Sequence, residues 1–556
     1  MSWRSTKRAR YGLAWLVVLL LVAWMRPTAS MQSAPDTRVI AAAKAGDRAA
    51  VRRLVAARAN VNAAERDGST ALLWAVYNAD LEMTRALVAA GAKVDATNRY
   101  GVTPLLQAAR TGETAIVEAL LTAGANPTLA HPEGETPLMA AARSGKVDAV
   151  RLLLARGADV NESDEYQEQS ALMWAASEGH LNVVQALLEA GANPNLKARE
   201  TTLTQRRHGD HPTGGFTPLM WAVRNGHEDV VEALVKSGAD LKATNGDNAT
   251  ATIIAIVNDR LDLAARLLDL GADPNDGSLY FAVDWHDGTT DMRMRDGGLL
   301  RWDYPNKLTA MDLIKKLVDM GADVNKPFRG QLHSYSLGTG DNHNGSPFYR
   351  AAVASDVEVL KYLATKGADL AWAPPPAPGG RGGAARPPFI AASTGGRGYA
   401  FGGGPGFGRQ GDPVWREEGS RKPVDAVKVL IDAGADPNVQ LDDDGNTALH
   451  LAAQRNDLEM IRVLAAGKAD LQAYNWTGQT PIDIAEEALA KLKDPNAEPD
   501  PAVVQAMVAG TALPQSKATP VETVALLREL LGWPPLADTP APAAAPAPAT
   551  TTAQGN

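Results

Sequence analysis

One pattern recurs along this chain at a fixed interval, and it constrains the fold more than any other feature. Segments that begin at Gly68, Gly101 and Gly134 follow one another every 33 residues, and the same pattern returns from Gly215 and from Gly445. A period of this length is typical of arrays in which one unit cannot bury its apolar faces alone, whereas a stack of units can. The sequence therefore predicts a stack of similar units in place of a single globular core.

Each unit carries the signals of two short helices joined by a turn. Thr103 and Thr136 stand where a hydroxyl can cap a first helix, and Pro104 and Pro137 follow at the first helical position. A second segment, such as EDVVEALVKS, has its apolar residues at helical spacing. The glycine that ends it, here Gly238, suits a left-handed C-cap. The spacing thus predicts helix-turn-helix units.

These motifs resemble the ankyrin repeat family over about residues 37–490, which would hold about twelve units. The resemblance implies an all-α solenoid whose hairpin fingers and first helices line a concave face. In that family this face usually binds other proteins, and the family is not generally catalytic. On this basis we expect a scaffold that binds another protein and has no enzymatic activity of its own.

The distances between successive C-cap glycines locate inserted loops within the repeat. The largest gap, 67 residues from Gly367 to Gly434, holds a glycine-rich stretch between the two helices of one unit. Three of its glycines fit a dinucleotide-binding pattern, but no strand precedes them and no helix follows, so we do not expect that function. The inserted loops are expected near residues 196–214, 284–307, 326–346, 372–387 and 394–422.

Aromatic residues punctuate the insertions of the eighth and tenth units. Equivalent turns of a solenoid line up along one edge, so these side chains could converge into one surface for a partner or ligand. The alternatives are that the loops fold back over the helices or bind nothing, or that they build a small-molecule or enzymatic site. The residues concerned are Trp285, Trp302 and Tyr304, and Tyr399, Phe401, Phe407 and Trp415.

Two further residue types recur at fixed positions of the first helix. Arg110, Arg143 and Arg224 share a position near its end, where they either meet an acidic partner or form a solvated face. A tryptophan recurs three residues earlier in several units, and we interpret it as packing between units: Trp74, Trp174 and Trp221.

The sequence offers no catalytic, cofactor or metal site. Cysteine is absent, which removes disulfides and thiolate chemistry. His208 and His211 flank Asp210, but no third ligand has a suitable spacing, so no metal is expected. The formal net charge is -9, and no basic block lies in the body of the chain, which argues against nucleic acid as a partner.

The chain starts with basic residues followed by an apolar run over residues 11–25 and small residues up to Ser30. This pattern predicts over residues 1–30 either a secretory signal cleaved near Ser30 or a membrane anchor. The run has 15 residues, fewer than the roughly 20 that span a bilayer. Both alternatives place the body outside the cytoplasm, in the periplasm or secreted, and possible contact with the inner membrane is limited to this segment.

The repeat pattern decays toward the end of the chain. Residues 491–533 read as atypical capping helices of a terminal unit. Residues 534–556 are rich in proline and alanine and predict a disordered tail. We expect the protein to be a monomer.

Overall fold

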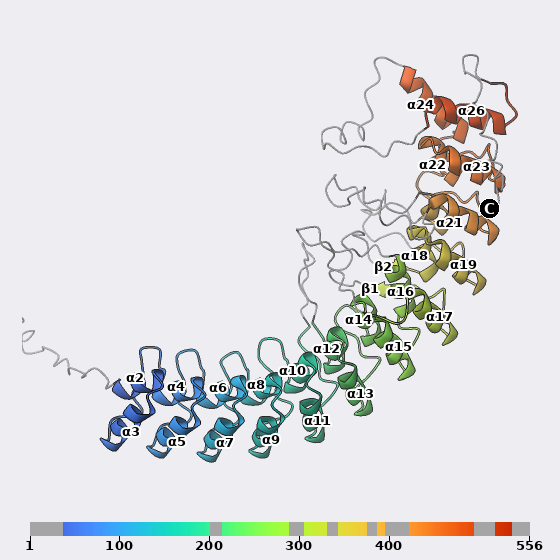
Figure 1. The fold of residues 1–556 in the computed structure, drawn as a ribbon. Helices are drawn as coiled ribbons and strands as arrows, with labels where there is room; N and C mark the ends of the chain where they lie inside the picture. The colour runs from blue at the N-terminus through green and yellow to red at the C-terminus, as the bar shows by residue number, and fades with distance from the viewer. Residues whose placement is uncertain are drawn as a thin grey trace, which may run out of the picture. The chain divides into compact units, whose positions relative to one another are not determined.

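The computed structural model describes residues 37–200, 214–287, 305–330, 343–374, 386–394, 422–493 and 518–535. Figure 1 shows its helices and strands, most of them labelled. The chain divides into an N-terminal part, Met1–Asn193, and a C-terminal part, Pro194–Asn556. Each part is a separate stack of helix pairs and is described by itself.

The N-terminal part contains five helix pairs (Figure 1). Each first helix packs against the first helices of the neighbouring pairs, and each second helix does the same with the second helices. The pairs are α2 (Arg38–Lys44) with α3 (Arg48–Ala56), α4 (Ala71–Tyr77) with α5 (Leu81–Ala89), α6 (Pro104–Thr111) with α7 (Thr114–Thr122), α8 (Pro137–Ser144) with α9 (Val147–Ala155), and α10 (Ala171–Glu178) with α11 (Leu181–Glu189).

The C-terminal part contains seven helix pairs built in the same way. The last helix, α26, packs on α24, its partner in the seventh pair, and on α23 of the sixth pair. The pairs are α12 (Pro218–Asn225) with α13 (Glu228–Lys236), α14 (Ala251–Val257) with α15 (Leu261–Asp269), α16 (Ser278–Asp287) with α17 (Ala310–Asp319), α18 (Pro347–Ala354) with α19 (Val357–Thr365), α20 (Pro388–Thr394) with α21 (Pro423–Asp432), α22 (Ala448–Gln454) with α23 (Leu458–Ala466), and α24 (Pro481–Lys493) with α26 (Pro520–Leu530).

The described residues therefore hold twelve helix pairs, which confirms the predicted all-α solenoid of about twelve units. One of the expected insertions contains the two strands of the described residues. Near residues 326–346 the chain forms a two-stranded antiparallel ribbon, in which β1 (Phe328–Gly330) pairs with β2 (His343–Gly345). The described ends of this insertion are therefore held together by backbone hydrogen bonds, and the residues between them lie outside the described ranges.

The helices begin and end where the sequence signals stand. The Thr103 hydroxyl accepts a hydrogen bond of 3.0 Å from the backbone N–H of Leu106, and Pro104 opens α6. Gly124, which follows α7, has a φ of 88°, a left-handed conformation that residues with a side chain adopt at a cost. Ala108 and Ala109 are fully buried between the first helices. Their small side chains let neighbouring units approach closely.

Neighbouring fingers, the loops that connect one unit to the next, are joined by backbone hydrogen bonds. In the N-terminal part, the backbone N–H of Arg99 donates to the carbonyl of Asp67 over 2.6 Å. The backbone N–H of Glu165 donates to the carbonyl of Glu133 over 3.2 Å. At the base of the fingers, the Asn62 amide donates to the Gly91 carbonyl over 2.9 Å. These bonds fix the register between units and hold the finger tips in a row.

A buried histidine, His450, connects the last two fingers of the C-terminal part, and its charge depends on pH. His450 is fully buried at the start of α22. Its Nε2 donates to the Gln479 carbonyl over 3.0 Å, and its Nδ1 accepts from the Thr447 backbone N–H over 3.1 Å. Burial lowers the pKa of His450 below its ordinary value of 6.5. The folded state therefore favours the neutral ring.

We predict that stability falls when the pH drops below about 6.5, because the unfolded chain then binds a proton at His450 that the folded chain resists. The stabilisation that the neutral His450 ring provides is complete above that pH, and it is lost as the pH falls toward the lowered pKa. Urea unfolding at about pH 7.5 and about pH 5.5 should show a smaller pH effect in His450→Gln than in the wild type. An identical pH effect in both proteins would contradict this role.

Candidate interaction surface

The first helices of the N-terminal part share two positions that contact each other across units. We call the residues four and seven positions after each N-cap the first-helix stripe. Lys44, seven after Thr37, lies with its Nζ 4.4 Å from the ring centre of Trp74, which is four after the next N-cap. Arg143 stands over Trp174 in the same way, with its Cζ 4.8 Å from the ring centre. These cation–π contacts, worth about 0.5–1 kcal/mol each at exposed sites, join successive units.

The half-buried rings of Trp74 and Trp174 agree with the interpretation that the repeated tryptophan packs between units. Trp221 holds the same position in the C-terminal part, where its ring lies 5.1 Å from that of Phe216. Arg224 lies over both rings, with its Cζ 5.6 Å from the centre of Trp221 and 6.0 Å from that of Phe216.

The three predicted arginines of the stripe are exposed, and two of them already face carboxylates. Arg110 pairs with Glu135, and its Nε donates over 2.9 Å. Arg143 lies 4.0 Å from Glu178, with 58% of its side chain exposed. Exposed ion pairs of this kind contribute about 0–1 kcal/mol. An acidic partner could therefore replace the glutamates at little cost, so a binding role for these arginines stays a prediction.

Exposed aromatic residues at the finger tips were missed by the sequence analysis. Tyr100 and Tyr166, in the N-terminal part, are 54% and 71% exposed, and Tyr474 and Trp476, in the C-terminal part, are 65% and 63% exposed. The sequence did offer a signal for them, because large aromatic residues stand there in turns that otherwise hold polar residues. Tyrosine and tryptophan supply a large share of binding energy in protein interfaces, which makes these tips candidate contacts.

Trp285 does not lie in an inserted loop, and that prediction was wrong. Helix α16 continues to Asp287, past the point where the other first helices except α24 end. Trp285 is 8% exposed, and its Nε1 donates to Asp259 Oδ1 of the preceding unit over 3.0 Å. The helix extends because no glycine or asparagine stops it there and because this tryptophan finds a half-buried hydrogen-bond partner in Asp259.

The extended end of α16 contacts the next unit through the polar side chains of Asp284 and His286. Asp284 pairs with Arg350 of α18, and both side chains are only 12% exposed. His286 Nδ1 lies 2.5 Å from Asp356 Oδ2, at the start of α19, and its Nε2 lies 3.8 Å from Glu358. Burial raises the pKa of the neighbouring Tyr280, which therefore stays uncharged and serves as a packing group. This cluster holds units eight and nine together.

Six of the predicted aromatic contacts lie outside the described residues. The same holds for the histidine pair of the first insertion. The expectation that the insertions converge, and the alternative of a small-molecule or enzymatic site built from them, therefore stay predictions. These residues are Trp302, Tyr304, Tyr399, Phe401, Phe407 and Trp415, together with His208 and His211.

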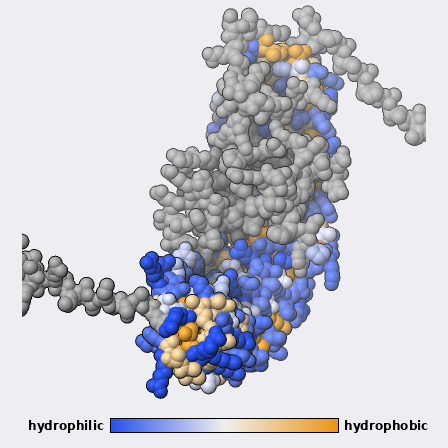
Figure 2. Space-filling view, turned by 60° about the vertical axis from the view of Figure 1, so that its left-hand side comes forward, coloured by the Kyte–Doolittle hydropathy of each residue, from blue (hydrophilic) through white to orange (hydrophobic). Residues whose placement is uncertain are grey.

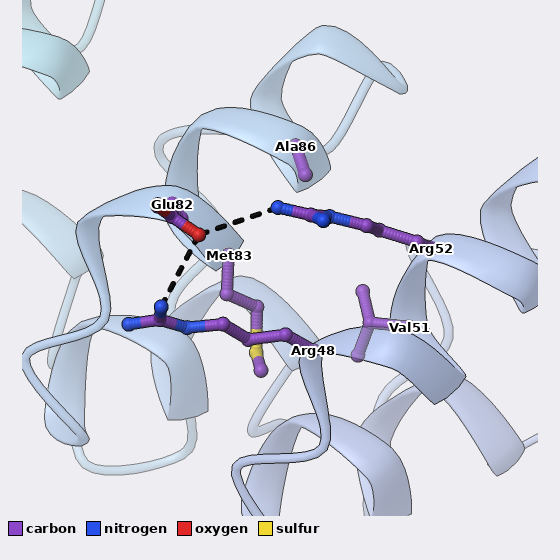
Figure 3. Close-up of a pocket in the computed structure, with 6 residues that line it drawn as sticks. All are labelled: Arg48, Val51, Arg52, Glu82, Met83 and Ala86. Atoms are coloured by element: carbon purple, nitrogen blue, oxygen red, sulfur yellow. Dashed lines mark hydrogen bonds and ion pairs between the residues drawn. The ribbon is translucent and has the colours of Figure 1, made fainter.

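Within the described ranges, no three histidine or acidic side chains gather as a metal site would require. No helix there is long and apolar enough to cross a membrane, and residues 11–25 lie outside these ranges. A hollow between α3 and α5 is floored by Val51 and Met83 (Figure 3). It is too shallow to enclose a water-sized molecule.

Stacked helix pairs with hydrogen-bonded fingers define a helical repeat protein. Family models described as "Ankyrin repeats (3 copies)" match residues 39–131, 126–198 and 202–278, and "Ankyrin repeats (many copies)" matches residues 419–465. The chain belongs to the ankyrin repeat family, whose members generally mediate interactions between proteins.

Similarity to individual proteins is limited to short segments. The chain is 41% identical over 64 residues to protein phosphatase 1 regulatory subunit 12A of Mus musculus, which covers 12% of this chain and 6% of that protein. It is 44% identical over 62 residues to protein PhlB of Serratia liquefaciens, covering 11% and 27%. The ankyrin repeat domain of human ASB11 aligns with a TM-score of 0.33 and 26% identity over 39% of this chain and 90% of that domain. The matches to the curated relatives span well under two thirds of their lengths.

Proposed function

We propose that this chain is an exported ankyrin-repeat scaffold that binds another protein through its fingers and first helices and has no catalytic activity of its own. The observation that carries the proposal is the row of exposed tyrosines and paired arginines on hydrogen-bonded fingers and first helices of the N-terminal part. The residues stand on elements whose register is fixed, so a partner would meet a preformed surface. Preformed contact surfaces lose less conformational freedom on binding.

The basic start and apolar run of residues 1–30 support the export part of the proposal. Whether the run is cleaved near Ser30 or kept as an anchor, the repeat units would lie on the outer side of the membrane. The expected partner is therefore another protein of the periplasm or of the outside.

The proposed face predicts a position-dependent crosslinking pattern. A photo-crosslinking amino acid at Tyr166 or Arg143 should yield adducts with one partner protein when the chain is produced in its own cells. Arg151 is a matched control, because it is exposed on the second helix α9 of the same unit as Arg143. Adducts formed equally from all three positions, or only from Arg151, would contradict the assignment of the face.

A further inference from the structure

The first unit of the solenoid carries a charge opposite to that of the whole chain. Residues 37–60, which form α2 and α3, contain six basic side chains and one acidic side chain, a formal net charge of +5 against -9 for the whole chain. The basic residues are spaced out along the sequence, so no block stands out, and the fold of one unit gathers them. They are Arg38, Lys44, Arg48, Arg52, Arg53 and Arg58.

Only part of this positive charge is neutralised by neighbouring residues. Arg48 pairs with Asp80 over 2.7 Å, and both Arg48 and Arg52 reach Glu82 over 3.2 Å (Figure 3). Arg53 and Arg58 are exposed and make no ion pair with any residue in the described ranges. The unit therefore keeps free cationic groups at its surface.

The end of the solenoid formed by this unit is not covered by another described unit. Exposed alanines lie on both of its helices: Ala41 in α2, and Ala49 and Ala56 in α3. Figure 2, which brings this end of the chain forward, shows a pale orange apolar area bordered by blue hydrophilic residues. Terminal units of repeat proteins ordinarily present a polar outer face, because no neighbour buries it. An alanine face edged by arginines is instead amphipathic.

This face also lies close in sequence to the apolar run at the start of the chain. Only the twelve residues from 26 to 37 separate the end of that run from α2. Even fully extended, twelve residues reach about 40 Å. If the run remains attached and enters a bilayer, the first unit is thereby held beside the membrane surface.

We propose that the outer face of the first unit rests on an anionic membrane surface, with Arg53 and Arg58 facing lipid phosphates. Basic residues near such a surface favour binding by roughly fivefold each, and the effect extends only about a Debye length. A second copy of the chain fits this face poorly, because a symmetric contact would set the free arginines against their own equivalents. The inference goes beyond the proposed partner binding and concerns a different face.

The absence of cysteine allows the face to be probed with single labels. Ala49→Cys carries an environment-sensitive fluorophore on the first unit. Ala115→Cys is the matched control, because both alanines are exposed and both stand two residues after the N-cap of a second helix. The full chain is reconstituted into vesicles of phosphatidylcholine alone and of phosphatidylcholine with phosphatidylglycerol.

The emission of the label at residue 49 should shift to shorter wavelength in the anionic vesicles only, and high salt should reverse the shift. The label at residue 115 should respond to neither vesicle. Adding Arg53→Gln and Arg58→Gln should abolish the shift while leaving helicity unchanged, because neither arginine pairs with a described residue. The same emission at residue 49 in both vesicles, an equal shift at residue 115, or a response only to an added acidic protein would overturn the proposal. None of these outcomes depends on the crosslinking face.

Discussion

Replacing Arg350 by alanine should lower the free energy of unfolding of the C-terminal part by about 3 kcal/mol. The Asp284 and Arg350 side chains that join α16 to α18 are each only 12% exposed. Removing one partner of a buried pair leaves the other charge without compensation, which commonly costs about 3–5 kcal/mol. We take the lower end because both groups keep some contact with solvent. Urea unfolding followed by tryptophan fluorescence would measure the loss.

Two comparisons separate the loss of charge compensation from the loss of a large side chain. The double replacement Asp284→Leu with Arg350→Met removes both charges and keeps the volume, so it should recover most of the stability. Arg224→Ala removes an exposed arginine that stacks on two rings, and it should cost about 1 kcal/mol or less. If Arg350→Ala costs no more than Arg224→Ala, the pair does not hold the two units together.

The parts of the fold that follow from local chemistry were predictable from the sequence. Thr103 caps α6 and Pro104 opens it because a hydroxyl and a missing N–H suit those two positions in any helix. The glycine at residue 124 marks the end of α7 because its left-handed conformation disfavours other residues. Repetition of these signals fixed the number of units.

The contacts between units eight and nine were not predicted, since their partners lie 66 and 70 residues apart in the sequence. One signal was available. Asp284 stands at the stripe position that holds arginine in three other units, and Arg350 stands at the position of the recurrent tryptophan. An acidic residue where other units have arginine, together with an arginine at the position that it faces in the next unit, indicates an ion pair between the two units. The position of Trp285 was missed because the end of a helix depends on such partners.

The candidate surface was predictable only in part. The shared position of Arg110, Arg143 and Arg224 gave their place on the first helices, but not their glutamate and aromatic neighbours. The exposed finger-tip residues Tyr100 and Tyr166 belong to turns whose side chains vary from unit to unit. Exposure there depends on how the fingers stack, which the repeat pattern does not encode.

Deleting one complete unit should be tolerated far better than deleting half of one. Removing residues 101–133 takes out α6 and α7 together and joins Tyr100 to Gly134, which begins the next unit at the same point of the repeat. The first helices α4 and α8 can then pack together, as can α5 and α9, so the net loss is one unit and one interface. Far-ultraviolet circular dichroism should show a loss of helix in proportion to the residues removed, with one cooperative melt.

Removing only residues 113–125 deletes α7 and leaves α6 in place. The apolar faces of α5 and α9, which α7 covers, would then be exposed, and α6 would lose the second helix against which it packs. Leu120 and Val117 of α7 are fully buried, and burying a side chain of this size contributes about 1.5–3 kcal/mol, so the loss from the whole helix is several times larger. We expect the half-unit deletion to lose helix well beyond its thirteen residues and to melt at a much lower temperature. Equal losses in the two deletions would show that the units do not stack in the register given by their glycines.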